Sequence, residues 1–132
     1  MSEPLDLRRE SALRWLEYAR RDLKLARAAA ADEDLLGLAA FLAQQAAEKA
    51  LKAYAAWLGV SEIPKTHKLI RLAGLVREAG GDSSFSEEDL GELTLYAVDG
   101  RYPDTPTPDK DTAVRVIEFA ASVYGFVKER VS

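Results

Sequence analysis

The spacing of apolar residues predicts two long helices in the first half of the chain. Apolar positions recur alternately four and three residues apart at Ala12, Leu16, Ala19, Leu23, Ala26 and Ala30. This interval places them on one stripe of a helix, which we predict from about Leu7 to Ala31. The same spacing resumes at Ala39, Ala43, Ala46, Ala50, Ala53 and Trp57. It predicts a second long helix that begins after the acidic capping run 32–34 and ends at Gly59.

Three shorter helices are predicted in the second half. Thr66 is placed to cap a third helix, which Gly80 and Gly81 end. Ser86 resembles the first residue of a capping box and opens a fourth helix that we expect to reach Gly100. The prolines between 103 and 108 predict an extended, stiff connection. A last helix is expected from Pro108 or Lys110 to the C-terminus.

These elements predict an all-α fold. No stretch alternates as a strand would, and the alanine- and leucine-rich faces suit an up-and-down antiparallel four-helix bundle with an additional fifth helix. We expect one domain over residues 1–132, with Leu42, Ala46 and Trp57 packed inward. The second helix is apolar almost all round, which favours self-association. The residues on which this expectation rests are Leu35, Leu38, Phe41, Leu42, Leu51, Tyr54 and Leu58.

The amino-acid composition excludes several classes of functional site. The 132 residues include no cysteine and one histidine, so disulfides, thiolate metal sites, cysteine nucleophiles and multi-histidine metal centres are excluded. We therefore expect neither a metal nor a cofactor. The longest apolar run, 35–43, is too short to span a bilayer, and we expect a cytoplasmic protein. The net charge is −4, with nine acidic and two basic residues between positions 82 and 111.

The second helix carries the most informative polar residues. Gln44, Glu48 and Lys52 follow one another at four-residue spacing, with Gln45 and Lys49 in the adjacent row. Five polar groups therefore share one side of an otherwise apolar helix. Taken alone, the pattern is also that of a solvated stripe with a Glu48–Lys52 pair worth a few tenths of a kcal/mol.

Two further segments suit the recognition of anions. His67 is expected at the first turn of the third helix, beside Lys68 and one turn before Arg71, where free backbone N–H groups favour phosphate. Arg101 precedes Tyr102 and the proline-rich connection, and a guanidinium suits phosphate or carboxylate. The alternatives are a capping role for His67 and a tether from Arg101 to Asp99 or Asp104. Basic residues of the first helix, Arg20, Arg21, Lys24 and Arg27, cover more than one face and indicate a solvated surface.

Taken together, these segments resemble the HEPN domain, a nucleotide-binding domain of higher eukaryotes and prokaryotes. The resemblance runs from about Arg14 to Val127 and rests on Asp22-Leu23, QQAAEKALKA in the second helix, Thr66-His67-Lys68-Leu69 and Arg101-Tyr102-Pro103. It implies an all-α bundle, commonly a homodimer, similar to the C-terminal domain of kanamycin nucleotidyltransferase. Such domains often act beside a minimal nucleotidyltransferase in a two-component or toxin–antitoxin pair.

The resemblance implies roles for matching positions only. Lys49, Lys52, His67, Arg101 and Tyr102 are the expected ligand-binding residues, for a nucleotide or RNA. The expected supporting polar network is Asp22, Gln45 and Glu48.

The chain departs from HEPN ribonucleases at one motif. Those enzymes carry an arginine four to six residues before a histidine, whereas Ser61, Glu62 and Ile63 occupy these positions here. We therefore expect a non-catalytic binding module. The alternatives are a metal-independent ribonuclease that uses His67 and Arg101, and a purely structural bundle in which the same polar residues form a buried network. Under the first hypothesis, Lys49, Lys52, His67 and Arg101 should converge on one cleft, with Arg101 at the C-terminal end of the second helix.

Overall fold

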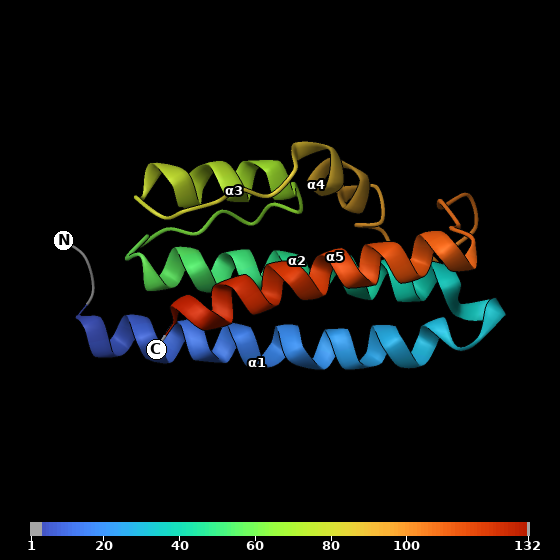
Figure 1. The fold of residues 1–132 in the computed structure, drawn as a ribbon, viewed down its shortest axis with the longest axis horizontal. Coiled ribbons are helices and arrows are strands. Elements are labelled where there is room, and N and C mark those ends of the chain that lie inside the picture. Colours follow the sequence, from blue (N-terminus) through green and yellow to red (C-terminus); the bar gives the residue numbers. More distant parts are fainter. Residues whose placement is uncertain (1–3, 132) are drawn as a thin grey trace.

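The computed structural model describes residues 4–131, and this part of the chain contains helices and no strand (Figure 1). The all-α prediction is confirmed. The five α-helices are α1 (Leu5–Ala30), α2 (Leu36–Trp57), α3 (Leu69–Glu78), α4 (Glu87–Thr94) and α5 (Lys110–Arg130), and the short 3-10 helix η1 (Glu33–Leu35) joins α1 to α2.

Helices α1 and α2 form an antiparallel hairpin with the most extensive contact in the fold. Asp32 caps η1 by accepting a 2.9 Å hydrogen bond from the Asp34 backbone N–H. The predicted stripes are buried, and we call their alanines with no exposed surface the alanine seam: Ala12, Ala19, Ala26, Ala39, Ala43, Ala46, Ala50 and Ala53. Because the distance between packed helices depends on the side chains between them, the seam allows close packing.

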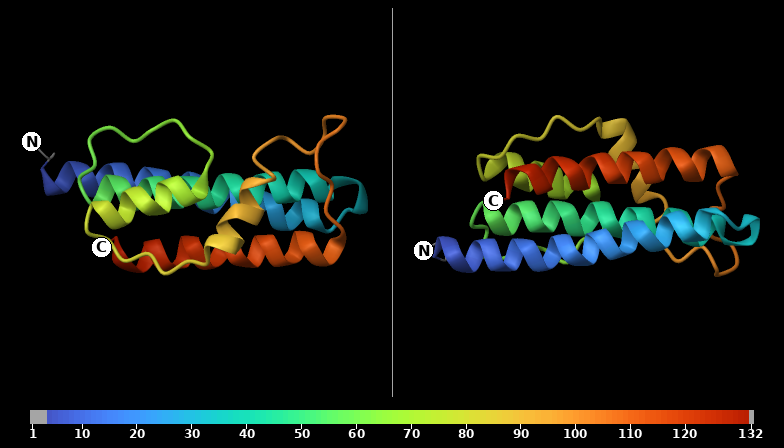
Figure 2. Two further views of the ribbon diagram at one scale, coloured as in Figure 1. Left: turned by 90° about the horizontal axis from the view of Figure 1, so that it is seen from above. Right: turned by 60° about the horizontal axis from the view of Figure 1, so that its bottom comes forward.

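The link from α2 to α3 differs from a simple up-and-down path. Residues 58–68 return along α2 as an extended segment, so α3 runs in the same direction as α2 (Figure 1). Val60 N–H donates to Ala55 O at the end of α2, whereas the His67 carbonyl accepts from Gln44, far back along that helix. Pro64 favours the extended conformation because it excludes the helical region for its preceding residue. Figure 2 shows this segment and α5 on opposite sides of α2.

The start of α3 also differs from the expectation. Thr66 was predicted to cap this helix, but α3 begins at Leu69. The Thr66 hydroxyl accepts from Lys68 N–H at 3.2 Å, and the Leu69 N–H donates to the Thr94 hydroxyl of α4 at 3.3 Å. His67 therefore lies in the extended segment before α3, and the expected placement in the first helical turn is wrong.

Helix α4 ends at Thr94, short of the predicted end at Gly100. The chain turns there so that Gly100 can lie against Gly37, at the start of α2. A Cβ atom on Gly100 would lie 2.4 Å from the Gly37 carbonyl carbon, so this crossing requires glycine. Asp109 then caps α5 by accepting from Thr112 N–H at 2.8 Å, and this hydrogen bond lowers the pKa of the Asp109 carboxyl.

Helix α5 completes the core by packing against α1 and α2. Phe85, Phe119 and Phe126 form edge-to-face contacts, the closest with ring centroids 5.0 Å apart. Arg115 of α5 forms an ion pair with Glu92 of α4 and lowers the pKa of that carboxyl.

The predicted inward packing of α2 is borne out unevenly. Ala46 is fully buried, whereas Leu42 and Trp57 are half-buried at the edge of the core. Among the residues that favoured self-association, Leu51 and Tyr54 are buried within the chain, and the others remain half-buried. Among residues 4–131, no helix has the length and apolarity required to cross a bilayer.

Candidate functional site

The polar residues of α2 form a buried network around Glu48. The Glu48 side chain is 7 % exposed and accepts a 3.0 Å hydrogen bond from Lys52 Nζ at one oxygen. Its other oxygen lies 2.7 Å from His67 Nδ1. A buried carboxylate is costly unless it is paired and hydrogen-bonded, and both conditions are met here. The interpretation of this row as a solvated stripe is therefore wrong for Glu48 and Lys52.

Glutamines extend the network to the backbone of the return segment. Gln44 is fully buried, and its Nε2 donates to the His67 carbonyl at 3.0 Å. Gln45 Nε2 donates to Gln44 Oε1 at 2.8 Å. Since Glu48 holds the His67 ring and Gln44 holds its backbone, α2 fixes this residue at two points.

The remaining α2 lysine joins the network to α1. Lys49 Nζ lies 2.6 Å from Asp22 Oδ2, and both side chains are largely buried. Lys52 Nζ also lies 5.7 Å from the centre of the Trp15 ring, close enough for a cation–π interaction. The side chains of Lys49 and Lys52 are thus engaged inside the bundle, where they hold α1 and α2 together.

His67 differs from these groups because its side chain is 62 % exposed. Its Nδ1 lies 2.7 Å from Glu48 Oε1, and a carboxylate in this position favours the tautomer that carries a proton on Nδ1. A carboxylate placed behind an imidazole in this way fixes the tautomer and the orientation of the ring. Within the described chain, Nε2 has no hydrogen-bond partner.

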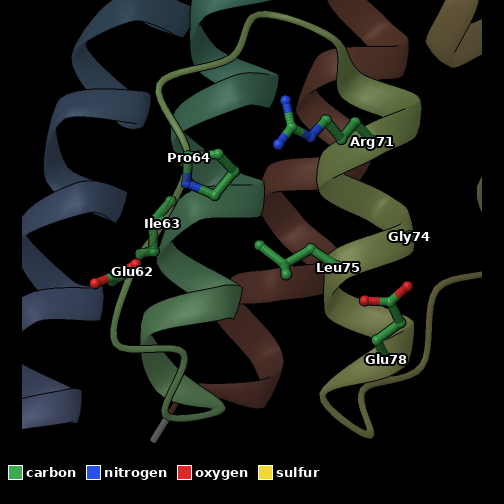
Figure 3. Close-up of a pocket in the computed structure, with 7 residues that line it drawn as sticks. All are labelled: Glu62, Ile63, Pro64, Arg71, Gly74, Leu75 and Glu78. Atoms are coloured by element: carbon green, nitrogen blue, oxygen red, sulfur yellow. The ribbon is translucent and has the colours of Figure 1, made fainter.

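A hollow of about 700 Å³ lies between the return segment and α3. Figure 3 shows Arg71 at one end of it and the carboxylates Glu62 and Glu78 toward the other. The lining residues between the charged ends are Ile63, Pro64, Gly74 and Leu75. Arg71 follows His67 by four residues, so the histidine lies on the chain just before the cationic end.

Arg101 lies away from this arrangement, and its predicted convergence with the other cations is wrong. Its side chain is 64 % exposed and forms a 2.6 Å ion pair with Asp99, which lowers the pKa of that carboxyl. Its neighbour Gly100 packs on Gly37, eleven residues before Glu48, or about 16 Å along the helix axis. Tyr102 beside it is 66 % exposed. The return of residues 58–68 along α2 places α4 and its following loop at the N-terminal end of that helix.

Comparison with known families identifies the family of the chain. The sequence profile of the HEPN domain matches residues 12–130. The chain belongs to the HEPN domain family.

Two solved structures have the same fold as this HEPN domain. The protein TT1696 from Thermus thermophilus superposes with a TM-score of 0.70 at 28 % sequence identity, covering 89 % of this chain and 96 % of that one. ST0689, described as an archaeal HEPN homologue, has a TM-score of 0.65 at 24 % identity, with 92 % and 98 % of the two chains covered. No curated protein matches the sequence.

The HEPN domain also contains site features that the sequence did not reveal. Glu62, Leu75 and Glu78 line the hollow, although no spacing or motif marks them, because their proximity depends on the path of the return segment. Within residues 4–131, no group of three or more carboxylate or imidazole side chains is placed to hold a metal ion.

Proposed function

We propose that this HEPN domain is a non-catalytic module that binds a nucleotide, alone or as part of a polynucleotide, in the hollow between residues 62–64 and α3. The observation that carries the proposal is the exposed His67 ring, which buried Glu48 holds in place on the chain four residues before Arg71 of the hollow. An orienting carboxylate behind an exposed imidazole is typical of a residue that contacts a ligand.

The two ends of the hollow match the two ends of a nucleotide. Arg71, with exposed Lys68 and His67 close to it in the chain, suits the phosphates, because a guanidinium can bind phosphate oxygens through two parallel hydrogen bonds. Glu62 and Glu78 supply acceptors for ribose hydroxyls or base amino groups. Ile63 and Leu75 give apolar surface between them.

The geometry supports binding over cleavage. The ribonuclease alternative requires His67 as general acid or base and Arg101 to stabilise the phosphorane. In the described part of the chain, Arg101 is engaged by Asp99 and no hydrogen bond or ion pair joins it to His67. We therefore assign His67 to ligand contact and Lys52 and Glu48 to its support.

The proposal predicts loss of nucleotide affinity on substitution of Arg71 or His67. Titration calorimetry with ATP and GTP should show at least tenfold weaker binding for Arg71→Ala and for His67→Ala, because each removes a phosphate contact. Arg77→Ala is the matched control, since Arg77 is an exposed cation of the same helix and does not line the hollow. Two results would support the purely structural alternative. The first is that the wild type does not bind nucleotide. The second is that the wild type and all three variants bind with equal affinity, while His67→Ala lowers the stability of the fold.

We also propose that the domain acts as a homodimer with a minimal nucleotidyltransferase partner, in a two-component or toxin–antitoxin pair. Family membership supports this arrangement, as do the half-buried apolar side chains Leu38, Phe41 and Leu42 on α2. Co-expression with a nucleotidyltransferase encoded beside it should yield a stable complex whose mass, measured by light scattering, includes two copies of this chain. Separate elution of the two proteins would contradict the proposal.

A further inference from the structure

A second hollow, of about 450 Å³, lies between α1 and α5. It is on the α5 side of α2, whereas the segment that carries His67 is on the other side (Figure 2). We call it the α1/α5 groove, and its lining residues are Arg20, Leu23, Lys24, Arg27, Ala121 and Tyr124.

The groove gathers cations along one line. Arg20, Lys24 and Arg27 are spaced four and three residues apart, which places them on one ridge of α1 that extends about 10 Å along the axis. All three are exposed, as the interpretation of the basic residues of α1 as a solvated surface requires, and Arg21 lies outside the groove. In a chain of net charge −4, the groove is a local concentration of positive charge.

Two of these cations are not engaged within the described chain. Arg20 forms an ion pair with Glu17 at 2.7 Å. Among residues 4–131, no hydrogen bond or ion pair involves the side chain of Lys24 or Arg27, and both residues are exposed. Arg27 also borders a smaller hollow, whose other charged lining residues are Lys110 and Glu118.

The opposite wall supplies an aromatic ring. Tyr124 of α5 is half-buried in the groove, and Lys128 Nζ lies 5.9 Å from its ring centre, close enough to add a further positive charge to this wall. Leu23 and Ala121 make the floor apolar. A basic ridge beside an aromatic face is the combination by which proteins hold single-stranded nucleic acid, with phosphates on the cations and a base on the ring.

We propose that the α1/α5 groove binds a short stretch of single-stranded nucleic acid. Lys24 and Arg27 contact successive phosphates, and one base stacks on Tyr124. The line of cations favours a chain of phosphates over a single phosphate group, and the shared backbone chemistry gives little sequence preference. The site is separate from the nucleotide hollow, because the two have no lining residue in common.

The test is fluorescence anisotropy with a labelled ten-nucleotide single-stranded RNA at low salt. The double variant Lys24→Glu/Arg27→Glu should bind at least tenfold more weakly than the wild type, and the salt dependence of its residual binding should be less steep. Tyr124→Ala should weaken binding about fivefold or more, in the range expected for loss of one stacked base, and Tyr124→Phe should not. Arg77→Glu on α3, compared with the single variant Lys24→Glu, is the control for a nonspecific change in net charge, since each replaces one cation by one carboxylate.

Each alternative has a distinct result. Equal loss on Arg77→Glu, or equal affinity of wild type and double variant, would overturn the groove proposal. Competition by polyglutamate as strong as that by unlabelled RNA would also overturn it, in favour of an acidic protein partner. Loss of RNA binding in His67→Ala but not in the double variant would place the polynucleotide in the hollow of the proposed function. Retained RNA binding in His67→Ala, with lost ATP binding, supports two separate sites.

Discussion

Glu48→Leu is expected to lower the free energy of unfolding by about 3–5 kcal/mol, the range measured when one partner of a buried ion pair is removed. The substitution leaves the Lys52 ammonium, 10 % exposed, without its carboxylate inside the bundle. It also frees the His67 ring. Chemical denaturation followed by circular dichroism gives the difference directly.

Two control variants distinguish this effect from simple loss of a charge. Glu17→Leu removes an exposed partner of Arg20 and Arg21 and should change stability little, because solvent screens that pair. Glu48→Leu/Lys52→Met removes both charges and should recover most of the lost stability. A single Glu48→Leu variant as stable as the wild type would show that Lys52 reaches solvent and that the network does not hold the return segment.

Gly100→Ala is expected to destabilise the protein by about 1–3 kcal/mol, as overpacking commonly does. The new methyl group would lie 2.4 Å from the Gly37 carbonyl carbon, a contact with backbone that no rotamer change can relieve. The loop must therefore move away from α2. Thermal and chemical denaturation measure the loss of stability, and hydrogen exchange should increase around residues 95–104.

Gly125→Ala is the matched control for this substitution. Gly125 lies inside α5, and no atom of another segment is within 4 Å of the position that its Cβ would take. Alanine there should raise stability by up to about 1 kcal/mol, because it favours the helix over the unfolded chain. Equal effects of the two substitutions would mean that the Gly37–Gly100 contact does not constrain the loop.

The helices were predictable because the seam alanines repeat at the helical period over several turns. The Glu48–Lys52 pair was predictable for the same reason, since residues four apart on a helix face each other. The path of residues 58–68 was not predictable, because an extended segment has no period and its position depends on contacts with distant residues. Thr66 illustrates the difficulty. Its place in the sequence predicts that it caps α3, but the Leu69 N–H at the start of that helix donates to the hydroxyl of Thr94 in α4 instead.

The residues of the candidate site also differ in whether local sequence spacing could identify them. Local spacing identified Gln44, Glu48 and Lys52 as a unit, and His67 was selected from the sequence around it. Its contact with Glu48 spans nineteen positions and requires the return segment. Arg101 was expected at the wrong end of α2 because each helix was assumed to reverse the direction of the one before it. The same assumption gave no reason to expect a hollow between residues 62–64 and α3.

The alanine seam has a consequence for which substitutions the α1–α2 hairpin can accept. A core of leucines is damaged mostly by truncation, since shortening a side chain opens a cavity. Alanine offers only a methyl group to remove, so truncation opens little space here. Enlargement at Ala19 or Ala46 instead overpacks the core and strains the backbone around it, because neither residue has exposed surface into which a longer side chain could turn. At the seam positions, the side chain's volume therefore has an upper limit set by packing.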